Sequence, residues 1–242
     1  MKKLKTKDLL IITILLLIVL VTGFMLLKKN LKIKEELKEV KETNLIDVYK
    51  DINDISINSL KEKYNNDDIV ALLEIKSLDI LMPIVKTNNN NYYLNHSLYK
   101  NESFISSVPF IDYRQDETSK QINIYGHNSS IYDLPFKKLE NYLDHTFYEN
   151  NKDIYFKYND TLEHYEIFSV AIVNKSSKEE HMKFTYESDE EYKEHFKRLK
   201  EMSIYEDGVI INNNEKVLVL QTCLFGKYYN KLLIISAKKI AL

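Results

Sequence analysis

The sequence predicts a mainly β domain with peripheral helices, preceded by a membrane-spanning segment. From Asp68 to the C-terminus, short apolar runs rich in β-branched residues alternate with short polar turns. That pattern favours a closed barrel or a sandwich. Hydrophobic residues make up 44% of the 242-residue chain, enough for a core, and the low counts of 4 Gly and 3 Pro argue against global disorder. We expect residues 67–242 to form one domain.

The membrane segment is the apolar run 9–27, which only Thr13, Thr22 and Gly23 interrupt. At about 1.5 Å per helical residue this run is long enough to cross the hydrocarbon core of a bilayer. No small-residue cleavage site follows it. We therefore predict an uncleaved signal anchor in residues 1–29, with a cytoplasmic tip and the rest of the chain outside the cytoplasm. A cleaved signal peptide is the alternative.

Residues 30–66 are predicted to form a helical stalk that leads into the domain. They begin with a run of mixed charges, and apolar residues then recur at helical spacing. The whole chain has a net charge of −2, and residues 1–29 contribute +5 (six Lys, one Asp), so the remainder carries −2 − 5 = −7. An acidic domain argues against nucleic-acid binding, which needs a basic surface.

The domain itself contains nine candidate strands and two candidate helices. The helix 188–202 begins with a capping box at Ser188 and Glu191. Its apolar face comprises Tyr192, Phe196 and Leu199, and we expect the neighbouring His195 at the surface. A shorter helix is expected at 136–143. The candidate strands are 69–75, 80–85, 108–112, 122–125, 154–158, 165–173, 209–211, 217–220 and 232–236.

Cys223 is the only cysteine and stands at the end of a predicted strand. A lone thiol cannot form a disulfide within its chain, so it is either a small buried hydrophobe or a nucleophile. A nucleophilic thiol needs a base, and an imidazole is the usual one. His127 has the most suggestive context, because it follows the predicted strand 122–125 and a glycine. The other histidines are His96, His145, His164, His181 and His195.

At these residues the chain resembles a known family. Leu220-Gln221-Thr222-Cys223 resembles the cysteine signature of sortases, and Tyr125-Gly126-His127-Asn128 matches their histidine motif. The segments 91–96 and 109–114, and the helix before the cysteine strand, look like class B sortases in particular. The likeness runs from about Asp68 to the C-terminus.

The resemblance implies a sortase-type closed β-barrel of about eight strands on the outer face of a Gram-positive plasma membrane. Cys223 would be the nucleophile and His127 the general acid and base of a transpeptidase. The expected substrates are secreted proteins with a C-terminal sorting motif of the Asn-Pro-x-Thr type, cleaved after Thr. A cell-wall precursor amine of the lipid II type would accept them. Leu220, Thr222 and Asn128 would bind substrate, and neither a metal nor another cofactor is implied.

The chain departs from the family at the catalytic arginine, which sortases carry on the strand after the cysteine. No arginine follows Cys223 here, and the position falls on Lys231 or Leu232. Neighbouring strand residues face opposite sides, so the exact register matters. Lys231 is one candidate stand-in, and Arg114 or a backbone amide near Cys223 is another. Alternatively, the chain is a catalytically impaired sortase homologue that acts as a surface binding protein.

Overall fold

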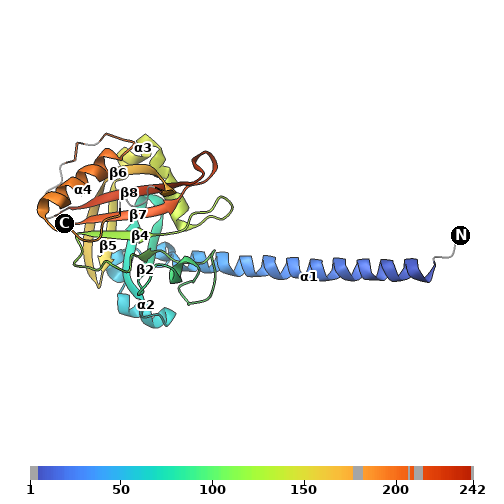
Figure 1. Cartoon of the computed structure of the whole chain (residues 1–242). Helices are drawn as coiled ribbons and strands as arrows, with labels where there is room; N and C mark the ends of the chain where they lie inside the picture. Colours follow the sequence, from blue (N-terminus) through green and yellow to red (C-terminus); the bar gives the residue numbers. More distant parts are fainter. Residues whose placement is uncertain (1–4, 177–181, 207, 210–214, 241–242) are drawn as a thin grey trace.

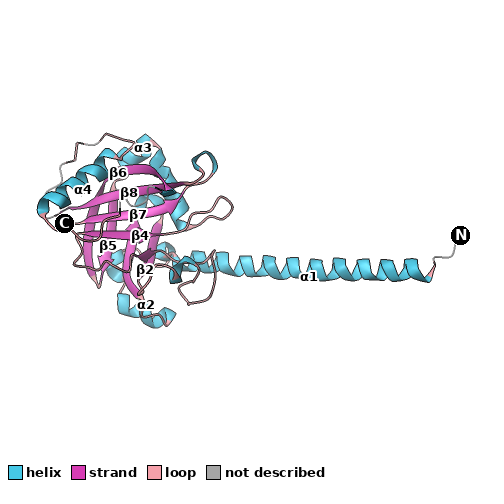
Figure 2. Cartoon of the chain, viewed as in Figure 1, coloured by secondary structure: helices cyan, strands magenta, loops and turns pink. Residues whose placement is uncertain are grey.

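The computed structural model describes residues 5–176, 182–206, 208–209 and 215–240. Within these ranges, eight strands close a mixed barrel in the order β1-β2-β3-β4-β7-β8-β6-β5 (Figure 2). The predicted closed barrel is thereby confirmed, and the sandwich is excluded. The strands are β1 (Ile69–Ile75), β2 (Ile80–Val85), β3 (Phe110–Ile111), β4 (Gln121–Tyr125), β5 (Asp153–Tyr158), β6 (Thr161–Asn174), β7 (Val217–Cys223) and β8 (Lys231–Ile240).

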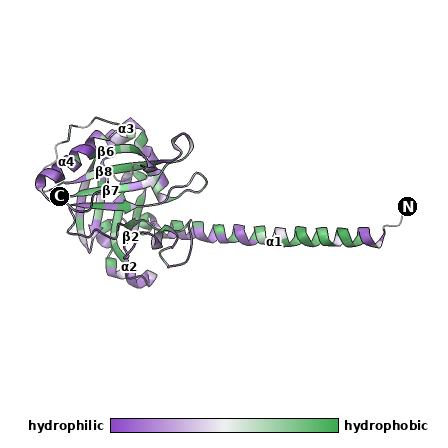
Figure 3. Ribbon diagram, in the orientation of Figure 1, coloured by the Kyte–Doolittle hydropathy of each residue, from purple (hydrophilic) through white to green (hydrophobic). Residues whose placement is uncertain are grey.

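A single long helix, α1 (Thr6–Thr43), precedes the barrel and runs through both the predicted anchor and the start of the stalk (Figure 1). Its N-terminal half is apolar and its C-terminal half is polar (Figure 3). By length and composition it is the one described helix able to cross a membrane. The ion pairs Lys32–Glu36 and Lys38–Glu42, with N–O distances of 3.7 and 3.3 Å, add to the stability of the polar half.

The rest of the expected stalk packs on the barrel rather than extending from it. Two single-turn helices, Leu45–Asp47 and Ile52–Asp54, lead into α2 (Ile57–Tyr64). Apolar residues of these turns and of α2 share one hydrophobic cluster with the outer faces of β1 and β2. Residues 45–55, which the apolar spacing predicts as helix, form separate single turns instead. Most of their apolar side chains bury against the sheet, whereas Val48 is 66% exposed.

Strands β4 and β7 lie side by side and parallel, in the register Ile124 opposite Leu220. Both therefore end at the same rim of the barrel. The inward-facing side chains of both strands belong to the main hydrophobic core. This arrangement brings two chain segments that are about a hundred residues apart to one edge.

The helix α4 (Asp189–Glu201) packs where the sequence predicts, with Tyr192, Phe196 and Leu199 buried. The Ser188 hydroxyl accepts a hydrogen bond from the Glu191 amide, as expected of the cap. The prediction for His195 is wrong, because its side chain is only 1% exposed. His195 Nε2 lies 2.8 Å from Gln121 Oε1 on β4, and this polar partner permits burial.

One further prediction differs from the structure, and another falls largely outside the described residues. The expected helix 136–143 is a run of 3₁₀ turns, Pro135–Leu143. The candidate strand 209–211 falls largely outside the described residues, and Val209 itself belongs to no strand. The remaining strands are found at the predicted places, although β6, β7 and β8 are longer than expected.

Candidate active site

Cys223 is the last residue of β7, where the strand reaches the rim of the barrel. β4 lies on one side of β7 and β8 lies antiparallel on the other. In the β7–β8 register Cys223 stands directly opposite Leu232. The thiol is half-buried and unoxidised, so it occupies the partly exposed position that a reactive cysteine needs.

His127 follows the end of β4 after a single residue, Gly126. The Gly126 amide donates to the Gln221 carbonyl at 3.1 Å. The Thr222 hydroxyl donates to the Gly126 carbonyl at 2.8 Å. These two hydrogen bonds join the ends of β4 and β7, and so hold the segments that carry His127 and Cys223 next to each other.

Position 126 has no room for a side chain, so it requires glycine. A Cβ at this position would lie 2.4 Å from Cδ2 of Phe136, a buried core ring. We therefore expect Gly126→Ala to lower the free energy of unfolding by roughly 1–3 kcal/mol through overpacking, and to lower activity by displacing His127. Urea unfolding and peptide turnover measure these two effects. Gly208→Ala is the matched control, because no atom of the described residues lies within 4 Å of a Cβ built there. Equal stability of the two variants would contradict the prediction.

The His127 ring is enclosed between two loops. Its Nε2 lies 2.7 Å from the Leu94 carbonyl oxygen, and the Phe104 ring lies 4.2 Å away, centroid to centroid. Burial lowers the pKa of the imidazole below its usual value, and the hydrogen bond to Leu94 acts in the opposite direction. Because a carbonyl only accepts, Nε2 carries the proton, and in the neutral ring Nδ1 is the free base.

Cys223 and His127 line the same pocket, which has a volume of about 310 Å³. The wall combines apolar side chains with the amide side chains of Asn90, Asn91 and Gln221, a mixture suited to an extended peptide. The structure thus brings together the two residues that the sequence predicts as nucleophile and base. The other lining residues are Asn90, Asn91, Leu94, Val108, Phe110, Tyr125, Gly126, Met182, Gln221, Thr222 and Leu232.

The expected substrate-binding residues occupy different places. Thr222 lines the pocket. Leu220 is fully buried in the barrel core and Asn128 is 2% exposed, and neither is a lining residue. Asn128 Nδ2 instead donates to the Cys223 carbonyl at 2.8 Å and to Glu140. The hydrogen bond from Asn128 fixes the backbone carbonyl of Cys223.

The register of β8 places Leu232 and Lys231 on opposite faces. Leu232 pairs with Cys223 and lines the pocket. Lys231 pairs with Asn174 on β6, and its Nζ donates to Asn174 Oδ1 at 2.6 Å. In this structure a leucine thus faces the thiol, and the candidate stand-in Lys231 is engaged outside the pocket.

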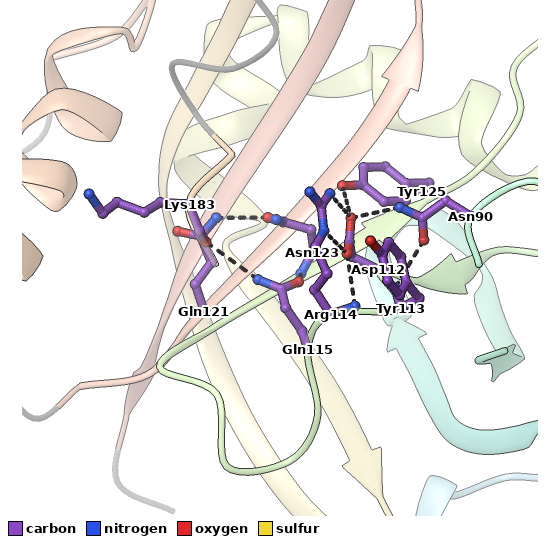
Figure 4. A network of polar contacts seen from close by, with 9 residues as sticks. All are labelled: Asn90, Asp112, Tyr113, Arg114, Gln115, Gln121, Asn123, Tyr125 and Lys183. Atoms are coloured by element: carbon purple, nitrogen blue, oxygen red, sulfur yellow. Dashed lines mark hydrogen bonds and ion pairs between the residues drawn. The ribbon is translucent and has the colours of Figure 1, made fainter. Parts of the chain in front are cut away.

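Arg114, the other candidate stand-in, belongs to a buried polar network (Figure 4). Its Nε and Nη2 donate to the Asp112 carboxylate at 2.8 and 2.7 Å. Asp112 is fully buried and also accepts from Asn90 Nδ2 at 2.8 Å and from the Tyr125 hydroxyl at 2.9 Å. These hydrogen bonds keep the pKa of Asp112 below its usual value despite burial, which alone would raise it.

This network has a direct consequence for the pocket, because Asn90 and Tyr125 are both lining residues. The Arg114 guanidinium also stacks 3.4 Å from the centroid of the Phe184 ring, two residues from the lining residue Met182. Asp112 and Arg114 thereby fix three segments of the pocket wall. The sequence alone does not predict this role, because the segment 110–114 stands out in it but its pairing with Asn90, Tyr125 and Phe184 does not.

Asp112 accepts hydrogen bonds from Arg114, Asn90 and Tyr125. Asparagine at this position would replace one accepting oxygen with an amide N–H group, which cannot accept from them. We expect Asp112→Asn to lower the free energy of unfolding by roughly 2 kcal/mol and to raise the peptide KM more than it changes kcat. Urea titration and steady-state kinetics measure these effects. Asp116→Asn is the control, because Asp116 is exposed and, among the described residues, its carboxylate accepts hydrogen bonds from Thr118 and Ser119 of its own turn. An unchanged KM in Asp112→Asn would refute the positioning role.

A closed barrel that brings a strand-end cysteine and a histidine into one pocket defines a thiol-dependent acyl-transfer enzyme. A family model described as the sortase domain matches residues 73–240. The chain therefore belongs to the sortase family of cysteine transpeptidases. The resemblance inferred from the motifs is confirmed.

Individual relatives are sortases B. The chain is 29% identical to sortase B of Listeria monocytogenes over 168 residues, which cover 69% of this chain and 67% of the relative. The crystal structure of Clostridium perfringens sortase B matches with 28% identity and a TM-score of 0.71, over 77% of this chain and 100% of that one. The Staphylococcus aureus sortase B–substrate complex shares the fold, with 23% identity and a TM-score of 0.68 over 77% of this chain and 85% of that one.

Proposed function

We propose that this protein is a membrane-anchored sortase of class B type. It cleaves a C-terminal sorting motif of the Asn-Pro-x-Thr kind after Thr and transfers the protein to a cell-wall amine. The observation that carries the proposal is the shared pocket of Cys223 and His127. Similarity to a sortase B that has been crystallised with its substrate supports a peptide ligand.

In the proposed first half-reaction, His127 Nδ1 takes the proton of the Cys223 thiol, and the thiolate attacks the threonine carbonyl. The tetrahedral intermediate collapses with loss of the C–N bond, and the imidazolium gives its proton to the leaving amine. The product is a thioester between Cys223 and the threonine. Burial of His127 favours its neutral form, so the ring is available as the base.

In the second half-reaction an incoming amine attacks the thioester. His127 removes the proton of the amine and returns it to the cysteine sulfur when the C–S bond breaks. The same geometry permits water as the acceptor, which would give hydrolysis instead of transfer. An amine and a water molecule attack the same carbonyl carbon, so the pocket admits either reaction.

The anchor is proposed to be α1, whose apolar run 9–27 would span the plasma membrane with residues 1–8 in the cytoplasm. The barrel then lies on the outer side, where sorting signals and cell-wall precursors are found. A helix of this length and composition supports a single span. Lysines flank both ends of the run, so the short preceding segment decides the orientation.

The test uses the full chain in detergent micelles with Asn-Pro-x-Thr and Leu-Pro-x-Thr-Gly peptides, with and without triglycine. We expect cleavage after Thr, preference for the first peptide, and a triglycine adduct visible by mass spectrometry. Product without adduct would indicate a hydrolase. Absence of both cleavage and thioester, with the Cys223 thiol still titratable, would favour the impaired binding protein.

A further inference from the structure

The polar half of α1 contacts loops that border the active site. Val40 is buried, and with Ile33 and Leu37 it packs in a hydrophobic cluster against Ile105 and the segment 132–134. Ile105 follows Phe104, whose ring lies 4.2 Å from that of His127. Residues 132–134 belong to the loop that begins at His127. The helix that carries the proposed anchor therefore packs directly on the loop that carries His127 and on the neighbouring loop that carries Phe104.

The length of α1 between the apolar run and these contacts is short. The run ends at Leu27, and Ile33 follows six residues later, about 9 Å along the helix axis. A bilayer of about 40–45 Å with a 30 Å core leaves roughly 5–8 Å of headgroups on each side. Because α1 is unbroken from Thr6 to Thr43, the loops are held just outside the headgroup layer.

Three loops at this end of the barrel point along α1 toward its N-terminus. They are the segments 99–107, 127–134 and 224–230, of which the last two project beyond the strands (Figure 1). Each of them exposes a large apolar side chain: Phe104 at 52%, Ile131 at 79% and Tyr229 at 81%. Lys227, two residues before Tyr229, is also exposed. Aromatic, aliphatic and lysine side chains together suit a headgroup interface with anionic lipid.

Single exposed hydrophobic residues are ordinary on protein surfaces. Here they stand on loops that project in the direction in which α1 extends toward its apolar half (Figure 3). At the opposite end of β4, the connection that precedes Gln121 exposes the polar segment Asp116-Glu117-Thr118 instead. The two connections of β4 thus differ, because the one at the active-site rim exposes the large apolar side chain of Ile131, whereas the segment 116–118 of the other is polar.

We propose that the loops 127–134 and 224–230 dock, through Ile131 and Tyr229, onto the surface of the phospholipid bilayer that α1 spans. The inference rests on the proposed anchor. The docking would place the pocket of Cys223 just outside the headgroup layer, facing the membrane rather than the cell wall. A peptide or an amine that is itself tethered to the membrane would then reach Cys223 without leaving the surface.

The chain contains no tryptophan, so single introduced tryptophans report their surroundings without background. Ile131→Trp and Tyr229→Trp test the two loops, and Glu117→Trp, at the other end of β4, is the matched control. The full-length chain is reconstituted into phosphatidylcholine–phosphatidylglycerol vesicles that contain lipids brominated near the headgroup. We expect blue-shifted emission and at least twofold quenching at 131 and 229, and little quenching at 117.

Equal, weak quenching at all three positions in vesicle-inserted protein would overturn the docking and leave the proposed activity untouched. Failure of the chain to remain in vesicles after alkaline extraction would overturn the anchor and the docking together. A second arm uses the double variant Ile131→Glu with Tyr229→Glu. We expect at least fivefold slower turnover of a vesicle-tethered peptide and unchanged turnover of the same peptide in solution; an equal loss on both would contradict the proposal.

Discussion

Cys223→Ala is expected to abolish both peptide cleavage and formation of the thioester. Alanine keeps the small apolar volume at the end of β7 and removes the only sulfur nucleophile in the pocket. Because the chain has no other cysteine, any residual labelling by a peptide with an electrophilic C-terminus would reveal a nucleophile other than a thiol. Intact-mass spectrometry after incubation with such a peptide gives the result directly.

Retention of more than a trace of activity in Cys223→Ala would remove the central claim of the proposed mechanism. Cys223→Ser separates the loss of the nucleophile from any structural change. A hydroxyl fits the same space, but it does not ionise near neutral pH and is a far weaker nucleophile than a thiolate. Thermal unfolding of both variants should match the wild type. The side chain is half-buried and makes no contact on which the fold depends, beyond packing at the edge of the α4 cluster.

His127→Gln should lower kcat/KM by roughly 10²–10⁴-fold, the usual contribution of a general acid and base. The labelling rate of Cys223 should fall as well, because the base that takes the thiol proton is gone. Glutamine can still donate to the Leu94 carbonyl, so the loop is retained. His145→Gln is the control, since His145 is exposed and lies outside the pocket; similar losses in both variants would argue against a specific role for His127.

The positions of Cys223 and His127 could be predicted because each follows a recognisable strand, and parallel neighbours end at one rim. The beginning of β6 could not be predicted so readily. Asn159 and Asp160 both have positive φ, 43° and 63°, and form the two-residue turn of the β5–β6 hairpin. Beyond that turn the polar Glu163 interrupts the apolar pattern that marks a strand.

Glu163 also shows why pattern alone fails for buried polar residues. It is 6% exposed, and its carboxylate accepts hydrogen bonds from Lys239 at 2.6 Å and from the Tyr165 hydroxyl at 2.7 Å. The same applies to His195 with Gln121, and to Asp112 with Arg114 and Asn90. In each case at least one partner that permits burial comes from another segment: Lys239 for Glu163, Gln121 for His195 and Asn90 for Asp112. A single segment read by itself therefore predicts exposure.

The absent arginine leads to a further large effect, this time a gain. Leu232 faces Cys223 across the β7–β8 register and lines the pocket, and the motif comparison places the family arginine at Leu232 or Lys231. We expect Leu232→Arg to raise kcat/KM for the preferred peptide by about 10²–10³-fold, the rate usually lost with one oxyanion donor. The guanidinium would reach the tetrahedral oxyanion from the strand next to the nucleophile.

Two matched variants separate charge from geometry. Leu232→Met keeps the volume without charge and should leave the rate unchanged, whereas Leu232→Lys supplies a cation without the forked donors and should give a smaller gain. A folded Leu232→Arg that is no faster than Leu232→Met would show that the oxyanion donor is already supplied elsewhere.

Lys231→Met then decides whether Lys231 leaves Asn174 to supply that donor. A tenfold or greater loss would identify Lys231 as the stand-in, and an unchanged rate would leave the backbone amides near Cys223 as the remaining donors.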